Sequence, residues 1–88
     1  MRTDKFLQLS RLVKQRSFAN QACDRGYVLV NGKPAKPSSP VSVGDRITLD
    51  LPAGRIEVEV LALPTTKSVS REEAKTLYRV IAASDKIN

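Results

Sequence analysis

The chain has 88 residues and a formal net charge of +6, because 15 lysines and arginines outnumber nine aspartates and glutamates. This length suits one small domain with a single core. Histidine and tryptophan are absent and Cys23 is the single cysteine, which excludes histidine-based catalysis, disulfide frameworks and the usual zinc sites. No apolar run is long enough for a membrane span, and no signal peptide is visible. We therefore expect a cytoplasmic protein in which Cys23 is a buried packing residue.

The positive charge is concentrated in the first part of the chain. Residues 1–36 contain eight basic and two acidic residues, whereas residues 37–88 contain seven of each. The sequence pI is near 9.9, and a pI above about 9 is typical of nucleic-acid binders. Lipid binding usually needs a helix with a free apolar face, so nucleic acid is the expected partner and a membrane is not.

The N-terminal segment predicts two short helices. Thr3 is a candidate N-cap of the first, in which Phe6, Leu9 and Val13 recur at helical spacing. Periodicity does not decide whether residues 11–16 extend this helix or break it. Ser17 is a candidate N-cap of a second helix over residues 18–24. The apolar stripe expected on that second helix consists of Phe18, Ala19, Ala22 and Cys23.

Residues 27–63 are typical of antiparallel strands and turns. Tyr27–Val30 predicts a strand, and Asn31-Gly32 predicts a type I′ hairpin turn that leads into a short edge strand over Lys33–Lys36. Alternating apolar and polar residues predict two longer strands, Arg46–Leu51 and Arg55–Leu63. The polar residues expected on the solvent face of this sheet are Arg46, Thr48, Asp50, Arg55, Glu57 and Glu59.

The C-terminal segment predicts a third helix. Ser70 and Glu73 have the spacing of a capping box, and the helical spacing of apolar residues continues as far as Ile81. We expect this helix to pack on the sheet and residues 84–88 to be frayed. The predicted fold class is therefore α+β: two short N-terminal helices on a small antiparallel sheet, plus a C-terminal helix.

The acidic residues and glycines do not predict an enzyme. Each carboxylate lies at a predicted helix start, turn or solvent-facing strand position. Glu57 and Glu59 share one strand face, but no third ligand type is near them. The four glycines are scattered and form no phosphate-binding loop. We expect no catalytic residue, no metal site and no cofactor.

The N-terminal basic residues are the candidate binding site. On helical geometry, residues 2–16 would span at most about 20 Å, a length over which a row of cations can meet several phosphates. Phe6 and Phe18 are at predicted core positions, which leaves almost no exposed ring for stacking on single-stranded bases. The partner is therefore expected to be a folded nucleic acid recognised by its backbone and shape.

Two other classes stay open on the residues alone. The short helices could form a DNA-binding helix-turn-helix, with Asn20 and Gln21 facing out. The strand that leads into Asn31-Gly32 is also similar to β-grasp carriers, although the chain ends in Lys-Ile-Asn and lacks the Gly-Gly tail of those proteins.

A family resemblance favours RNA. The order of four sequence motifs resembles that of the S-four RNA-binding domain, the alpha-L motif. These motifs are Arg2-x-Asp-Lys-Phe-Leu, Ser10–Ser17, Gly26-Tyr-Val and Val43-Gly-Asp45. The resemblance is closest over residues 1–51 and assigns residues 1–63 to that domain, with residues 64–88 as a connector and C-terminal helix. The stand-alone form is similar to RqcP-type ribosome-quality-control proteins and to the fifteen-kilodalton heat-shock protein of the ribosome.

The resemblance implies a function and a set of contacts. It implies binding to large-subunit rRNA and peptidyl-tRNA on obstructed large ribosomal subunits, in support of the tailing of stalled chains beside a tail-elongation factor. We expect the protein to be a monomer. The alternative within the family is a recycling, heat-shock or assembly factor that binds rRNA. Arg2 and Arg16 match the key RNA-contacting arginines of the family. The remaining candidate RNA-binding residues, which match its general basic surface, are Lys5, Arg11, Lys14, Lys33 and Lys36.

Overall fold

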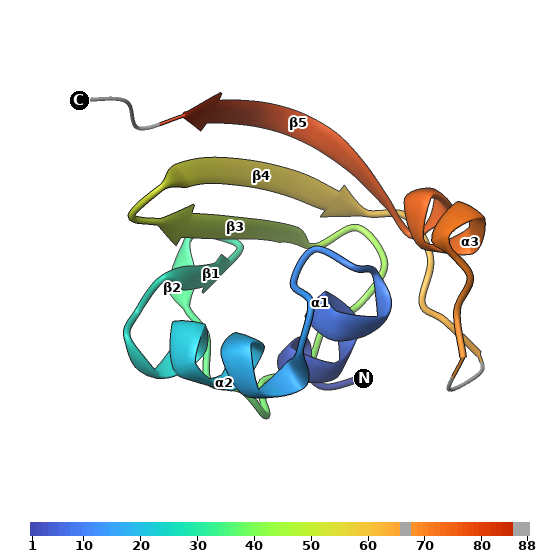
Figure 1. Cartoon of the computed structure of the whole chain (residues 1–88), viewed down its shortest axis with the longest axis horizontal. Helices are drawn as coiled ribbons and strands as arrows, with labels where there is room; N and C mark the ends of the chain where they lie inside the picture. The colour runs from blue at the N-terminus through green and yellow to red at the C-terminus, as the bar shows by residue number, and fades with distance from the viewer. Residues whose placement is uncertain (66–67, 86–88) are drawn as a thin grey trace.

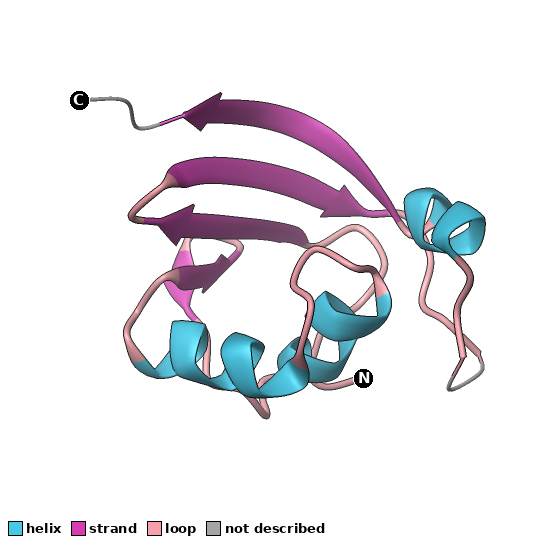
Figure 2. Ribbon diagram, in the orientation of Figure 1, coloured by secondary structure: helices cyan, strands magenta, loops and turns pink. Residues whose placement is uncertain are grey.

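The computed structural model describes residues 1–65 and 68–85 and shows an α+β fold, as predicted (Figure 1). Over these residues the helices are α1 (Thr3–Leu9), α2 (Arg16–Asp24) and α3 (Arg71–Thr76). The strands are β1 (Val28–Val30), β2 (Lys33–Pro34), β3 (Arg46–Leu51), β4 (Gly54–Val60) and β5 (Tyr78–Asp85). They form one antiparallel sheet in the order β2-β1-β3-β4-β5. Helices α1 and α2 lie on the same side of this sheet (Figure 2).

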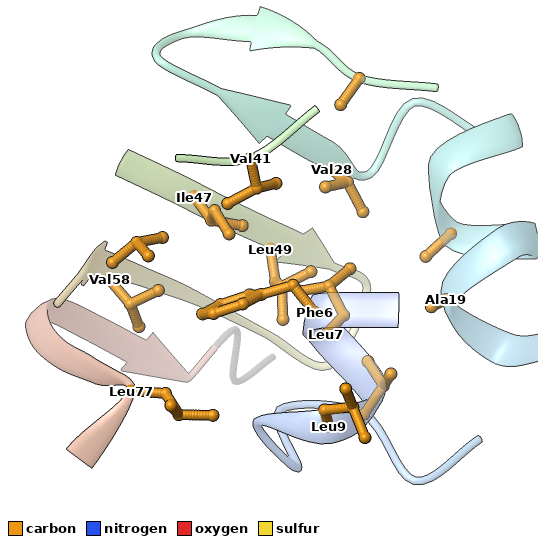
Figure 3. Packing of buried hydrophobic residues seen from close by; sticks show 14 of the residues in the cluster. Phe6, Leu7, Leu9, Ala19, Val28, Val41, Ile47, Leu49, Val58 and Leu77 are labelled. Carbon is orange, nitrogen blue, oxygen red and sulfur yellow. The ribbon is translucent and has the colours of Figure 1, made fainter. Parts of the chain in front are cut away.

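The hydrophobic core lies between α1, α2 and the sheet. Phe6 and Leu7 of α1 are fully buried, and so is Ile47 of the central strand β3. Figure 3 shows Phe6 beside Leu49, with Leu77 from the segment after α3 at the border of the same cluster. Burying each large aliphatic or aromatic side chain contributes about 1.5–3 kcal/mol, so this cluster fixes α1 against the sheet.

The hairpin signals are confirmed. Asn31 and Gly32 have φ values of 53° and 82°, as a type I′ turn requires at both central positions. The turn joins β1 to β2, with Val30 paired to Lys33, and β2 lies at one edge of the sheet. Strand β2 ends at Pro34, two residues before the predicted end. Strand β3 has the predicted bounds Arg46–Leu51, but Thr48, expected on the solvent face, is buried. It lies in the central strand, paired with Leu29 and Glu57, whose side chains flank it on the same face of the sheet.

The starts of α1 and α2 differ from the predictions. Arg2, in place of Thr3, occupies the N-cap of α1, because Thr3 is fully buried and its hydroxyl donates to the Ser39 carbonyl at 2.7 Å. Gln15, in place of Ser17, precedes α2 in an extended conformation. The chain between the helices is not helical, and Arg11 has a left-handed φ of 63°, so the first helix ends before residues 11–16.

The C-terminal prediction was correct for the start of the helix and wrong for its length. Ser70 caps α3, and its hydroxyl accepts a hydrogen bond from the Glu73 backbone N–H at 3.1 Å. The helix ends at Thr76, however, and Tyr78 and Ile81 lie in β5, which pairs with β4 from Val60↔Tyr78 to Gly54↔Asp85. This pairing satisfies backbone groups along β4 that a helix would leave open. Ser84 and Asp85, expected to be frayed, are paired, and residues 86–88 lie outside the described residues.

Candidate RNA-binding surface

A buried carboxylate organises the two arginines singled out by the sequence. Asp4, in the first turn of α1, is fully buried. Its Oδ1 and Oδ2 accept hydrogen bonds from Arg2 Nε at 3.1 Å and Arg2 Nη2 at 3.2 Å. Its Oδ2 also accepts from Arg16 Nε at 3.2 Å and from Asn20 Nδ2 at 2.7 Å. One acid therefore joins the start of α1 to two residues of α2.

The ionised form of Asp4 is stabilised by these partners. Burial acts to raise the pKa of Asp4, but hydrogen bonds from Asn20, Arg16 and Arg2, with the charge of Arg16, hold this pKa below its ordinary value of 3.8. The position in the first turn adds to this, because the helix macrodipole favours an anion there. Asp4 therefore stays charged at neutral pH and keeps both arginines in place.

Arg2 and Arg16 keep guanidinium N–H donors that the hydrogen bonds to Asp4 do not use. Their side chains are 49% exposed in Arg2 and 47% in Arg16. A guanidinium carries five N–H donors in a planar fork, and the bonds to Asp4 use two of them in Arg2 and one in Arg16. The pair can therefore present oriented donors to phosphate oxygens, which arginine binds in a bidentate manner.

The loop after β2 is held against the start of α1. The Thr3 N–H donates to the Ser39 carbonyl at 2.8 Å, and the Asp4 N–H donates to the Pro37 carbonyl at 3.1 Å. Within this loop the Lys36 N–H donates to Ser39 Oγ at 2.9 Å, and the Lys36 side chain is exposed. The structure thus places Lys36 on a segment bonded to the first turn of α1, the turn that carries Asp4.

Arg11 has a structural contact that the sequence did not predict. Its Nη2 donates to the Val69 carbonyl at 3.0 Å, which ties the segment before α3 to the loop between α1 and α2. A polar cleft of about 260 Å³ lies there, and Lys14, which is exposed, is part of its lining. Arg11 therefore fixes the loop that presents Lys14, in addition to any contact that it makes with RNA.

The other candidate residues are more dispersed. Lys5 is half-buried on α1, and Lys33 is exposed on β2 at the outer edge of the sheet. The structure therefore brings Arg2 and Arg16 together on Asp4 and places Lys36 on an adjoining loop, whereas Lys33 belongs to a separate element.

Sequence reasoning missed Asp4 and Asn20 as parts of this site, and it misplaced Phe18. Asp4 was interpreted as an ordinary acidic residue at the start of a helix. However, it lies three residues before Leu7, and residues three apart share one face of a helix, so Asp4 is on the buried face of α1. Phe18, predicted to be core, is 48% exposed, because Ala19, Ala22 and Cys23 are the residues with which α2 faces the core.

Comparisons with known proteins place this arrangement in a family. The S4 domain family model matches residues 1–47, from the start of the chain into β3. The chain belongs to the S4 domain family. This membership confirms the resemblance and the RNA-binding class that it implied, within the nucleic-acid binding predicted from the charge. The match includes Asp4 and all seven candidate basic residues.

Relatives of similar length extend the match beyond the S4 domain. A protein named RQC P-site tRNA stabilizing factor from Halalkalibacterium halodurans is 41% identical, over 91% of this chain and 89% of its own. Proteins of the same name from Bacillus subtilis and Helicobacter pylori strain J99 are 40% and 47% identical, over 92% and 83% of this chain and 92% and 87% of their own.

Solved structures share the fold. Heat shock protein 15 of Vibrio cholerae, solved as a trimer, has a TM-score of 0.83 at 34% identity, over 93% of this chain and 82% of its own. A hypothetical protein solved in solution has a TM-score of 0.80 at 39% identity, over 93% of this chain and 98% of its own. Both coverages extend past residue 47, so the likeness includes structure outside the S4 match.

Two further findings concern the described residues, 1–65 and 68–85. Within them, no helix is long and apolar enough to cross a membrane. In the same ranges, no three residues among the aspartates, glutamates and Cys23 lie close enough together to hold a metal ion.

Proposed function

We propose that this S4-family protein is a non-catalytic, ribosome-associated factor that binds peptidyl-tRNA in the P site and rRNA on obstructed large subunits in the cytoplasm. In this role it would support tailing of stalled chains in ribosome-associated quality control, beside a tail-elongation factor. The observation that carries the proposal is the Asp4-centred pair Arg2 and Arg16, within a chain whose relatives of similar length are named RQC P-site tRNA stabilizing factors. The S4 match supports neither a helix-turn-helix nor a β-grasp carrier.

The first experiment tests the RNA-binding surface. The affinity of the protein for isolated large ribosomal subunits is measured across salt concentrations for wild type, Arg16→Ala and Arg71→Ala. Arg71 is a matched control because it is exposed on α3, in the charge-neutral part of the chain. Arg16→Ala should weaken binding by about 1–3 kcal/mol and lower the salt slope by about one unit per lost phosphate contact. Equal effects of both variants would show that the surface is misplaced.

A second candidate function is a ribosome-recycling, heat-shock or assembly factor. The similarity to heat shock protein 15 of Vibrio cholerae favours it. Both functions use the same basic residues, so they are separated by what co-purifies with the tagged chain. Peptidyl-tRNA and a tail-elongation factor on large subunits would support quality control. Immature subunits without peptidyl-tRNA would support assembly and contradict the first proposal.

A further inference from the structure

An apolar groove lies beside α2, on the flank of the helix away from the arginine pair. It has a volume of about 290 Å³, and its lining includes Phe18, Gln21 and Arg25 from α2 and the segment that follows α2. Tyr27, Leu51 at the end of β3 and Pro52 in the turn between β3 and β4 also line it. The volume is at the lower end of small-ligand pockets, about 300–1,000 Å³, so the groove suits one ring system better than a long chain.

The groove contains the residue types that bind a nucleobase. Phe18 is 48% exposed and Tyr27 is half-buried, so two aromatic side chains border one small space. Aromatic rings and arginine guanidinium planes stack on unpaired RNA bases, and side-chain amides such as that of Gln21 bond to base edges. Arg25 is exposed next to the rings, where it can contact the base or its phosphate.

Charge favours RNA over a protein side chain as the occupant. None of the described residues that line the groove is acidic, and Arg25 supplies a positive charge at it. The groove also lies beside the helix that carries Arg16, one member of the arginine pair: α2 has nine residues, so it is about 14 Å long, and Arg16 is at its first position. The two places are therefore at most about 14 Å apart along the axis of α2, so one RNA segment that passes around this helix would contact both.

We propose that this groove, formed by Phe18, Tyr27, Arg25 and Gln21, receives one unpaired base of the RNA held by the arginine pair. This inference rests on the proposed RNA-binding function and adds to it a contact with a base, where the arginines contact phosphates. It also corrects the expectation that the chain has almost no exposed ring for stacking. An apolar side chain of a protein partner is the competing occupant, and the test separates the two.

The first arm of the test needs no ribosome. The wild-type protein is titrated with adenosine and uridine monophosphates, and with inorganic phosphate as the control, while the ring resonances of Phe18 and Tyr27 are followed by NMR. Saturable shifts of both rings with the nucleotides, and no such shifts with phosphate, are expected. Rings that do not respond to either nucleotide would overturn the proposal.

The second arm uses large ribosomal subunits and two substitutions at an exposed position. Phe18→Leu removes the ring but stays apolar, and Phe18→Tyr keeps the ring. We expect Phe18→Leu to weaken binding about five- to tenfold, as for loss of one stacked base, and Phe18→Tyr to bind like wild type. Chemical probing of the rRNA should show one base protected by wild type and Phe18→Tyr and reactive with Phe18→Leu.

The two arms separate failure of the groove from failure of the proposed function. If wild type binds large subunits and both variants bind them equally well, the base site is wrong. This outcome includes the case in which the groove holds a side chain of a protein partner and Phe18→Leu loses only that partner. If wild type does not bind large subunits, the proposed ribosomal function is wrong, and the nucleotide titration alone decides whether the groove accepts a base.

Discussion

Replacing Asp4 by asparagine removes the negative charge at the centre of the arginine pair while it preserves the shape of the side chain. The wild-type carboxylate accepts four hydrogen bonds from Arg2, Arg16 and Asn20. Asparagine has one acceptor oxygen, and its amide nitrogen would face donors. The substitution therefore breaks the link between the start of α1 and α2.

The expected loss of stability follows from the exposure of the partners. Hydrogen bonds to charged groups contribute about 1.5–3 kcal/mol each, but the two arginine side chains are roughly half exposed, and solvent reduces their share. The freed guanidinium groups can also be hydrated. We expect the free energy of unfolding to fall by about 2–3 kcal/mol, which for a domain of this size lowers the melting temperature by roughly 10–20 °C.

The effect on RNA affinity has two contributions of opposite sign. The substitution raises the formal net charge from +6 to +7, and one charge about 10 Å from a phosphate in water gains at most ~0.4 kcal/mol before salt screening. Loss of the carboxylate frees two arginines that must then be ordered on binding, at about 0.5–1.5 kcal/mol each. Positioning outweighs charge, so we expect affinity to fall about three- to 80-fold.

The assay compares Asp4→Asn with Asp24→Asn, which makes the same change of charge at an exposed position on α2. Affinity for large ribosomal subunits is measured at a temperature at which circular dichroism shows both variants folded. Asp24→Asn should bind as well as wild type or slightly better. If Asp4→Asn also binds better than wild type, net charge controls affinity, and the positioning role assigned to Asp4 is refuted.

Three further outcomes are expected. Because the pKa of Asp4 is lower in the folded protein than its ordinary value of 3.8, its ionised form stabilises the fold above that pH, and this contribution is lost as the pH falls through the lower folded-state pKa. In acid titrations of unfolding, the stability difference between wild type and Asp4→Asn should therefore shrink below about pH 4, and a constant difference would contradict the assignment. Gly32→Val should lower the free energy of unfolding by more than about 1 kcal/mol, because φ is 82° at this position. Gly32→Asn should lower it less. An unchanged melting temperature for the valine variant would refute the turn assignment. Burial, with the nearby charges of Asp4 and Asp24, raises the pKa of Cys23 to about 11. Thiol reagents should therefore label the native protein slowly. Cys23→Ala should lower the free energy of unfolding by about 1 kcal/mol without a change in RNA affinity.

Part of the candidate site could be predicted from the sequence because charge and residue order are properties of the chain itself. The concentration of positive charge before Pro37 and the ordered S4 residues predicted Arg2 and Arg16 as binding residues, although their contact with RNA remains a prediction. The role of Asp4 could not be predicted in the same way. Its partners on α2 are 12 and 16 positions away, and only the packing of α1 on α2 brings them within hydrogen-bond distance.

The C-terminal segment shows the limit of periodicity. Ser70 and Glu73 are three residues apart, so their capping contact depends on local backbone geometry and was predicted correctly. Ala74, Leu77, Tyr78 and Ile81 have helical spacing, yet the last two lie in a strand. The helix would have satisfied its own backbone groups, but β5 satisfies its groups and those of β4 together over seven residue pairs.

By itself, the sequence determined the features that depend on neighbouring residues or on the chain as a whole. These are the left-handed Asn31-Gly32 turn, the bounds of β3, the Ser70 cap, the α+β class and the basic N-terminal part. The tertiary structure alone decided which side chains meet across elements: the burial of Asp4 under two arginines, the exposure of Phe18 beside Tyr27, and the pairing of β5 with β4. The physical reason is that a turn or a cap is stabilised within a few residues, whereas a buried ion pair, a groove and a sheet edge gain their free energy from groups far apart in the chain.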